Sequence, residues 1–454
     1  MQKTKEWHVL AAVIAAGIMC FSGVLIETSM NVTFPALMEE FNVNANGVQW
    51  VTTGYLLAIA IIVPLSAYFI RNFSARTLFI VSNILFFMGI IMDSFAGTLS
   101  ILLAGRFLQG LGTGIALPLM FHIILTKSPM EKRGVMMGIG TMTTSIAPAI
   151  GPTYGGVLMG TLGWRAIFWF LVPLALISFG MGLYAMPQES VERSEKFNLG
   201  AFVFLGIGLS SLLLAIEQLS ITWFIGSLIA LIIFYYLNKQ RMLLNLNVFK
   251  NSVFDRLLYG VLIYQAMLLT LSFILPSFIQ IGLGKTSTVA GLFMFPGAVT
   301  GAILGPISGR ILDKIGPVKP IIFGLTASTI AMTSLAIAFQ WEQIWVFLGL
   351  HVLTMIGSGM AINNLMTATL SQLDETLSAD GNSVMNTLQQ FAGAAATAVA
   401  ARLFAMGQAS DAVHGAMIGG RNGVILLAVL FVIALLLFIT TIKLLNQQWR
   451  RLTT

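Results

Sequence analysis

Long apolar runs separated by short polar breaks make up almost the whole of this 454-residue chain. A helix needs about 20 mainly apolar residues to cross the hydrocarbon core of a bilayer, and the runs have that length. The pattern predicts an all-α polytopic membrane protein with fourteen transmembrane helices, at residues 9–34, 47–70, 76–98, 100–126, 134–160, 165–186, 198–218, 221–238, 255–281, 287–312, 318–340, 343–371, 381–406 and 423–445. Almost no sequence remains for a soluble domain.

Composition and charge strengthen this prediction. Hydrophobic residues make up 57% of the chain and charged residues 9%, whereas an average soluble domain has roughly 25% charged residues. In a soluble protein the net charge of +7 would suggest nucleic-acid binding, but here most basic residues fall in the loops on one side of the predicted spans. Because cytoplasmic loops carry the excess of Lys and Arg, we expect both termini in the cytoplasm, a multi-pass plasma-membrane protein, and no nucleic-acid partner.

The two longest polar connections, 187–197 and 239–254, flank the seventh and eighth runs. They predict an N-terminal six-helix bundle (1–187), a linker with two extra transmembrane helices (188–254) and a C-terminal six-helix bundle (255–454). A proline register repeats after the second span of each half, in Pro64-Leu65-Ser66 and Pro306-Ile307-Ser308. Repeated halves are how many transporters build two bundles that rock around a midplane site.

Among the charged residues within predicted spans, Glu27 and Arg106 are the first candidates for function. Glu27 shares one helical face with Gly23 and Asn31, and a carboxylate within a span tends to face the bundle interior and to be functional. Arg106 shares a face with Gln109, and an intramembrane cation needs a carboxylate or several carbonyl partners. The alternatives are a helix-capping glutamate that reaches water and an arginine that only anchors helices.

Two further acidic residues, Glu217 and Asp93, fall near the ends of the seventh and third runs. That position predicts that both are mainly interfacial. Glu217 is kept as a candidate second proton-coupling site beside Glu27 and Arg106. No His, Cys and carboxylate cluster has metal-ligand spacing, and no P-loop or nucleophile motif is present, so we expect no metal, no cofactor and no enzymatic activity.

Polar side chains recur at helical spacing in the thirteenth span and predict a face toward a water-filled cavity. The chain also contains 24 Met and 32 Phe, which suit irregular apolar ligands, although most such residues in a membrane protein pack or face lipid. The predicted substrate-binding residues, all polar and within spans, are Glu27, Asn31, Gln109, Thr113, Gln265, Asn363, Asn386, Gln389 and Gln390.

The fifth span contains APAIGPTYGG at 147–156. Residues 147, 151 and 155 place small side chains on one helical face, where a second helix can approach closely. The two prolines remove backbone hydrogen bonds, so a bend is expected. The residues of this motif are Ala147, Pro148, Gly151, Pro152, Gly155 and Gly156.

This stretch resembles the antiporter motif of the major facilitator superfamily. LAGRFLQGLG at 103–112 resembles the family's fourth-span motif, and IETSMNVTFP at 26–35 resembles the first-span signature of its fourteen-span drug:proton antiporter branch, the EmrB/QacA-like exporters. The resemblance implies the superfamily fold, proton coupling through Arg106, lipophilic or cationic drugs as small-molecule partners, a monomer, and a bacterial cytoplasmic membrane. Glu27 stands where the family usually has aspartate.

SGRILDKIGPV at 308–318 resembles the superfamily's gating-loop motif, with Gly309, Asp313 and Gly316 in the family's positions. The resemblance implies a latch that holds the cytoplasmic side shut. In the equivalent first-half loop, SAYFIRNFSAR at 66–76, Arg71 replaces the aspartate. We expect the first-half latch to be lost, unless the loop has simply drifted and its basic residues serve topology alone.

Three functions remain open at this point. The leading hypothesis is a proton-coupled multidrug efflux antiporter that works by alternating access and is driven by the proton gradient. The alternatives are an exporter or symporter of a natural metabolite on the same fold, and a non-transporting membrane receptor. Glu27 and Arg106 argue against the receptor, because it has little use for costly intramembrane charges.

Overall fold

A computed structural model of the chain describes residues 7–129, 132–189, 191, 197–341, 343–408 and 412–453. Within these ranges every regular element is helical. The elements are α1 (Val9–Ser29), η1 (Met30–Thr33), α2 (Phe34–Phe41), α3 (Ala45–Val48), α4 (Trp50–Ile62), η2 (Val63–Leu65), α5 (Ser66–Asn72), α6 (Ala75–Ser94), α7 (Leu99–Lys127), α8 (Arg133–Leu162), α9 (Arg165–Trp169), α10 (Val172–Ala185), α11 (Leu199–Gln218), α12 (Ile221–Gln240), η4 (Leu246–Lys250), α13 (Ser252–Ser277), η5 (Phe278–Gly282), α14 (Ser287–Ile315), α15 (Val318–Ala338), α16 (Ile344–Leu370), α17 (Glu375–Gln408) and α18 (Ala412–Thr453).

All fourteen predicted runs fold as helices, but some of the predicted ends were wrong. The first run continues from α1 through η1 and α2 and stops at Asn42, whose left-handed backbone (φ 50°) ends the helix. Twelve helical segments of the described residues are long and apolar enough to cross a membrane. The helices α8 and α17 are not among the twelve. Both have the length of a span, and both are the sites of polar or glycine-rich motifs.

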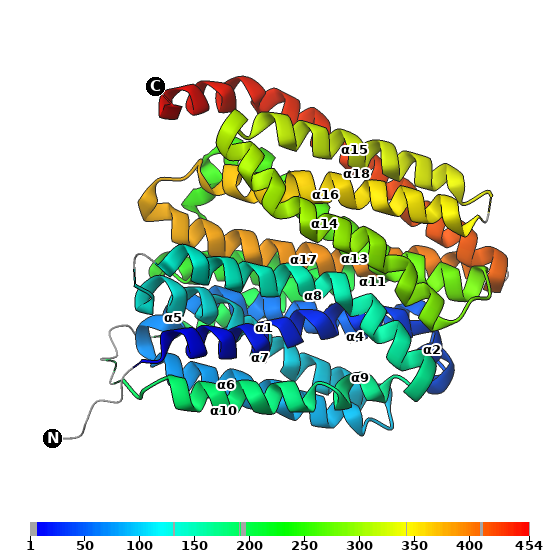
Figure 1. The fold of residues 1–454 in the computed structure, drawn as a ribbon, viewed down its shortest axis with the longest axis horizontal. Coiled ribbons are helices and arrows are strands. Elements are labelled where there is room, and N and C mark those ends of the chain that lie inside the picture. The colour runs from blue at the N-terminus through cyan, green and yellow to red at the C-terminus, as the bar shows by residue number, and fades with distance from the viewer. Residues whose placement is uncertain are drawn as a thin grey trace.

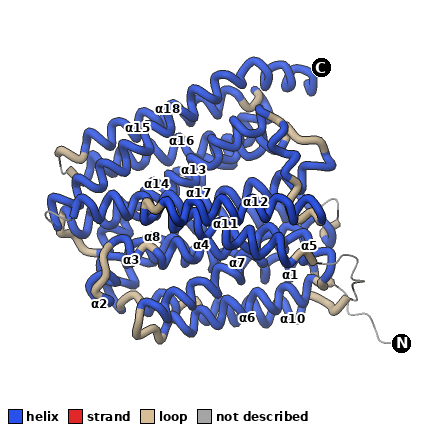
Figure 2. Tube along the Cα trace, turned by 180° about the vertical axis from the view of Figure 1, so that it is seen from behind, coloured by secondary structure: helices blue, strands red, loops and turns tan. Residues whose placement is uncertain are grey.

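The helices pack in two groups (Figure 1). The helices from α1 to α10 pack mainly against one another, and we call them the N-half. The helices from α13 to α18 do the same, and we call them the C-half. The hairpin of α11 and α12 belongs to neither group: α11 packs against α4 of the N-half and α17 of the C-half (Figure 2).

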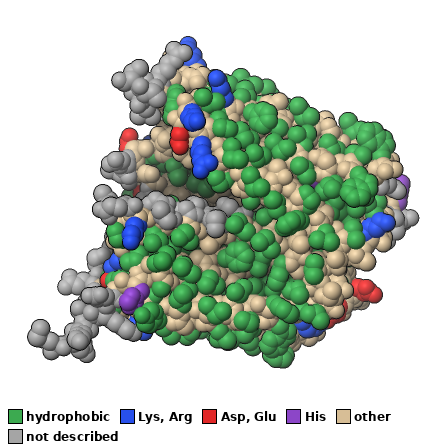
Figure 3. Space-filling view, viewed as in Figure 1, with side chains coloured by type: hydrophobic (Ala, Val, Ile, Leu, Met, Phe, Trp, Pro, Cys, Tyr) green, Lys and Arg blue, Asp and Glu red, His purple; other side chains and the backbone are tan. Residues whose placement is uncertain are grey.

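Both termini lie at the same end of the bundle, which we call the terminus side; the opposite end is the far side (Figure 1). Figure 3 shows the surface hollowed between the two halves on the terminus side. On the far side the halves are joined: the Gln280 amide donates to the Val32 carbonyl at 2.9 Å, and Phe34 packs on Phe273 with ring centroids 5.6 Å apart. The molecule is therefore open between its halves at one end and closed at the other.

On the face drawn in Figure 3, apolar side chains cover most of the surface between the two ends, whereas charged side chains gather at the ends. On α12 many large apolar residues point outward, including Phe224, Leu228 and Ile232, each about half exposed. A soluble monomer rarely exposes an apolar surface of this extent. The lateral surface suits a lipid bilayer, and the polar groups that matter for function lie inside.

Candidate functional site

Arg106 is fully buried at the centre of the N-half, near the far-side end of α7. Its Nε donates to the Val51 carbonyl of α4 at 3.0 Å, and its Nη1 donates to Gln109 Oε1 at 2.6 Å. The Gln109 amide is one turn further along the same helix, as the sequence predicted. Two fixed donors hold the guanidinium plane, while the remaining nitrogen, Nη2, has no hydrogen-bond partner among the described residues.

The Tyr55 ring of α4 packs against the Arg106 guanidinium. The Arg106 guanidinium lies 4.3 Å from the centre of the Tyr55 ring, a cation–π arrangement. The Tyr55 hydroxyl lies 2.8 Å from the Gly23 carbonyl and 2.9 Å from Thr113 Oγ1, so α1, α4 and α7 meet here. A side chain at Gly23 would collide, because a Cβ there would lie 2.5 Å from Thr113 Oγ1. Tyr55 was not singled out from the sequence, because no local pattern marks it.

Glu27 lies on α1 near this cluster and interacts electrostatically with Arg106. The residue is buried, with 7% exposure. Asn31 was predicted to be its polar neighbour on one α-helical face. In the structure Asn31 belongs to the tighter η1 helix and accepts a hydrogen bond from Thr52 Oγ1 at 2.7 Å. Asn31 therefore ties η1 to α4.

Asp93 is where the sequence prediction was wrong. It was expected at the membrane interface, yet it is fully buried in the last turn of α6, and neither carboxylate oxygen has a hydrogen-bond partner among the described residues. The reason is close packing with α7: a Cβ on Gly105 would lie 1.9 Å from Asp93 Oδ1, and a Cβ on Gly89 would lie 2.5 Å from the Gly105 carbonyl. Glycine on both helices lets α7 cover the carboxylate.

The small-residue face predicted in α8 is confirmed. A Cβ on Gly151 would lie 1.9 Å from Thr28 Oγ1, and one on Gly155 would lie 2.4 Å from the Ser29 carbonyl, so this face packs on α1. The next residue, Gly156, points to the other half instead, where a Cβ would lie 2.5 Å from the Ser287 carbonyl of α14. The helix α8 continues through Pro148 and Pro152. The motif therefore contacts both halves.

Glu217 lies apart from the Arg106 cluster, near the far-side end of α11. Its Oε1 accepts a hydrogen bond from Trp50 Nε1 of α4 at 3.1 Å, and its backbone carbonyl accepts one from Arg402 Nη1 of α17. A residue of the extra hairpin is thus bonded to both halves at once. The sequence indicated Glu217 as a candidate proton site. The structure shows in addition that it links the two halves by hydrogen bonds.

The predicted substrate-binding residues of the C-half lie on α13, α16 and α17, and we call them the C-half polar group. Gln265 on α13 lies beside α17, since a Cβ on Gly393 would be 3.6 Å from its Cγ. On α17, Asn386 donates to the Asn382 carbonyl at 2.9 Å, and Gln389 is 7% exposed. Asn363 on α16 is exposed, and Gln390 is half-buried. No hydrogen bond between described residues joins this group to Glu27 or Arg106, and no group of three His, Cys, Asp or Glu residues in the described ranges could hold a metal ion.

The protein-family model described as "Major Facilitator Superfamily" matches residues 14–397, most of the chain. The chain belongs to the major facilitator superfamily. The family predicted from the motifs is confirmed, and with it a multi-pass membrane transporter rather than an enzyme.

Among curated superfamily members, the chain is similar to "Lincomycin resistance protein LmrB" of Bacillus subtilis (strain 168), at 33% identity over 90% of this chain and 87% of that protein. It is 26% identical to "Putative multidrug resistance protein MdtD" of Pectobacterium carotovorum subsp. carotovorum (strain PC1), over 85% of both chains. Among solved structures, a POT family transporter in complex with 5-aminolevulinic acid has a TM-score of 0.72 at 12% identity, covering 94% of this chain and 95% of that one. The last likeness shows the superfamily fold alone.

The gating-loop residues of the superfamily motif lie on the terminus side. Asp313 is exposed and forms no hydrogen bond to another described residue, and a Cβ on Gly309 would meet nothing within 4 Å. Gly316 ends α14 with φ 84°, a conformation that favours glycine, and it packs on the Trp449 ring. Arg71, at the equivalent position of the first half, is exposed in the last turn of α5. In this structure, open on the terminus side, the Asp313 carboxylate is free of the contacts that a closed latch would need.

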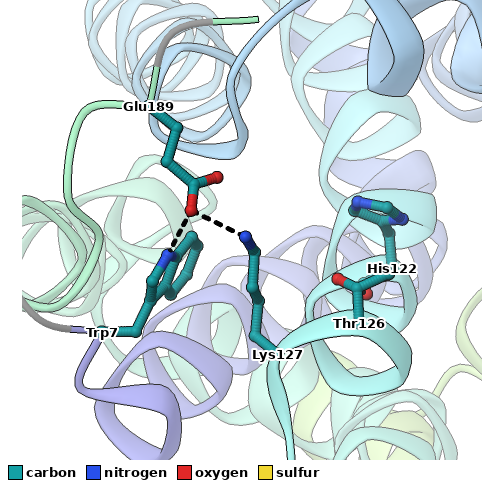
Figure 4. Close-up of polar contacts among 5 residues, drawn as sticks. All are labelled: Trp7, His122, Thr126, Lys127 and Glu189. Atoms are coloured by element: carbon teal, nitrogen blue, oxygen red, sulfur yellow. Dashed lines mark hydrogen bonds and ion pairs between the residues drawn. The ribbon is translucent and has the colours of Figure 1, made fainter.

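A polar cluster of Trp7, Lys127 and Glu189 ties three segments together on the terminus side (Figure 4). Glu189 Oε1 accepts hydrogen bonds from Lys127 Nζ and Trp7 Nε1, both at 2.7 Å, and Lys127 Nζ lies 4.9 Å from the Trp7 ring centre. His122 lies on the same helix as Lys127 and makes no bond to Glu189 in this view. Partial burial would raise the pKa of Glu189, but the two hydrogen bonds outweigh it and hold the pKa below the ordinary value of 4.5.

We expect Glu189→Gln to lower the melting temperature slightly at neutral pH. Because the pKa of Glu189 is lowered by folding, its stabilisation is present above the unfolded pKa and is lost as the pH falls through the folded value. The side chain is 36% exposed, so solvent screening limits the effect to about 0.2–1 kcal/mol. Thermal unfolding in detergent at pH 7 and below pH 4.5 checks this, with the exposed Glu39→Gln as control. An equal gap between wild type and variant at both pH values would contradict it.

Proposed function

We propose that the protein is a proton-coupled multidrug efflux antiporter that works by alternating access. The observation that carries the proposal is the intramembrane pair of charges in the N-half: Glu27 is buried with 7% exposure, and it interacts electrostatically with Arg106, whose Nη2 has no hydrogen-bond partner among the described residues. A carboxylate of this kind can take up and release a proton as its surroundings change, and the arginine can stabilise its ionised form. Glu27 is the proposed proton carrier.

We infer that the terminus side is cytoplasmic, since most Lys and Arg of the loops lie there. We propose that α8 and α17 also cross the membrane, which with the twelve apolar segments would make fourteen spans. Both helices are central and carry polar or glycine-rich faces, which lowers their hydropathy without preventing them from crossing inside the bundle. We propose the division into 1–187, 188–254 and 255–454, and the packing of the N-half, hairpin and C-half supports it.

With this orientation the structure corresponds to an inward-open state. The far side is closed by Gln280 with Val32, and by contacts of α8 with α14, where Thr153 Oγ1 donates to the Gly291 carbonyl at 3.0 Å. Drug would enter from the cytoplasm or the inner leaflet, the halves would rock, and a proton from outside would neutralise Glu27 and favour drug release. This is the order that an antiporter needs.

The proposed substrates are lipophilic or cationic drugs. Glu27 supplies negative charge for a cation, and the polar group of Gln265, Asn363, Asn386, Gln389 and Gln390 lies on helices of the opposite half. The similarity to a lincomycin resistance protein and to a putative multidrug resistance protein supports small-molecule efflux. We propose that the protein acts as a monomer, without a cofactor, and uses the proton gradient alone.

The test is transport by purified protein in liposomes with an acidic lumen. Wild type should accumulate ethidium in the lumen, and Glu27→Gln should abolish gradient-driven accumulation because the amide cannot carry a proton. Glu40→Gln is the matched control: Glu40 pairs with Arg165 at 2.8 Å at the far-side surface, away from the cavity. Equal accumulation by wild type and Glu27→Gln would remove Glu27 from the mechanism.

One observation keeps a second function in view. The C-half group is rich in amides, which suit a polar metabolite as well as a drug. If the wild type moves no lipophilic cation under any gradient, but moves a polar metabolite, the export or symport of a natural compound replaces the drug hypothesis.

A further inference from the structure

Asp93 is a buried acid that the proposed transport cycle does not yet use. It is fully buried, and both of its oxygens lack hydrogen-bond donors among the described residues. A carboxylate that only held helices together would be expected to accept hydrogen bonds, because an ionised group without partners is strongly penalised in such a place. In this structure Asp93 is therefore stable only when it carries a proton or when Arg106 compensates its charge.

Arg106 can compensate the negative charge of Asp93 as well as that of Glu27. Its Nε and Nη1 are fixed by Val51 and Gln109, whereas Nη2 is buried and unpaired. Electrostatic interactions link Arg106 to both Asp93 and Glu27. Nη2 of Arg106 is a single donor that can serve either Asp93 or Glu27. Only one of the two carboxylates at a time can therefore be neutralised by a direct bond to it.

The surroundings of Asp93 contain few other charges. From α7 it faces Gly105 and Arg106; Glu27 on α1 and Tyr55 on α4 act on the same arginine. From α9, Arg165 donates to the Ala96 carbonyl at 2.6 Å, but its charge is paired with Glu40 at the surface. No other titratable group of the described α9 and α10 lies near the far-side end of α6. Arg106 is therefore the group that sets the charge state of Asp93.

We propose that Asp93 is a second proton-binding site, coupled to Glu27 through the free Nη2 of Arg106. This rests on the proposed antiport. When both acids carry protons, Glu27 releases its proton to the open cavity and pairs with Arg106. When Nη2 turns to Asp93, the Asp93 proton moves to Glu27 and leaves by the same route. Two protons then cross for each drug molecule, and no bond other than those to protons is made or broken.

The number of protons decides whether transport carries charge. Exchange of one monovalent cation for two protons moves one net charge, whereas exchange for one proton moves none. In the liposome assay, a lumen-positive potential of ~60 mV should raise ethidium accumulation by wild type about tenfold. Asp93→Asn should keep transport driven by the pH gradient but lose this response to potential. Asp255→Asn, at the exposed start of α13, is the matched control and should behave as wild type.

The outcomes separate this inference from the proposed function. If wild type shows no gradient-driven ethidium movement, both fail. If wild type transports and Asp93→Asn keeps the same response to potential, only the role of Asp93 is overturned. Should Asp93→Asn fail to fold, Glu27→Gln protein in detergent provides the test: the infrared band of a protonated carboxyl should persist at neutral pH and decrease as the pH rises. Absence of that band would also overturn the inference.

Discussion

Arg106→Ala should abolish gradient-driven transport and lower the stability of the N-half. The substitution leaves the Val51 carbonyl and Gln109 Oε1 without their donors in a fully buried place and leaves Glu27 and Asp93 without a compensating charge. Loss of one partner of a buried charged network costs about 3–5 kcal/mol. Transport in liposomes and thermal unfolding in detergent measure the two effects.

Arg106→Lys distinguishes an anchor from a proton-coupling group. Lysine keeps the charge but cannot reproduce the fixed fork of Nε and Nη1 donors. We expect the variant to fold with intermediate stability and to transport poorly, with a shifted dependence on pH. The surface variant Arg421→Ala, on an exposed position of α18, is the control for loss of a positive charge. If Arg106→Lys restores stability and transport together, the arginine is only an anchor.

The second large effect concerns two adjacent glycines of α8. Gly155 faces α1 within the N-half, whereas Gly156 faces α14 across the closed far side. Overpacking by a new side chain costs about 1–3 kcal/mol. Gly155→Val should therefore reduce folding, because its neighbour is present in every state. Gly156→Val should fold, but it should shift the population away from the state closed on the far side by roughly 5- to 150-fold.

Thiol labelling can measure this shift, because the single native cysteine, Cys20, is buried and gives little background. A Gln280→Cys reporter lies at the contact that closes the far side. A maleimide that does not cross membranes should label it faster in Gly156→Val than in the parent. Unchanged labelling with normal folding would show that the α8 and α14 contact does not control closure.

The features that could be predicted from the sequence are those that depend on residue spacing within a single helix. Small residues four apart in α8 indicate close helix packing whatever the partner is, and the partner is α1. The Arg106 and Gln109 pair also follows from helical spacing. Asp93 was placed wrongly because burial at a helix end depends on a neighbouring helix, and Tyr55 was missed because nothing local marks a tyrosine whose role comes from Arg106.

The position of the C-half polar group could not be derived from sequence for a similar reason. Periodicity shows that Asn386, Gln389 and Gln390 share a stripe, but it does not show which helix lies opposite. The structure places Gln265 beside α17 at Gly393. The fold was predictable because membrane spans are encoded within single segments, whereas the site depends on contacts between segments.

The hairpin of α11 and α12 contributes hydrogen bonds to the closed far side. Glu217 is bonded through its side chain to Trp50 and through its backbone to Arg402, so the last turn of α11 acts as a crossbar between the two halves. When the halves separate on the far side, α11 must lose its hydrogen bond to Trp50 or to Arg402 and move with the half that it still contacts. A transporter of this fold without such a hairpin has to close by direct contact between its two bundles. Fewer contacts then have to break when it opens.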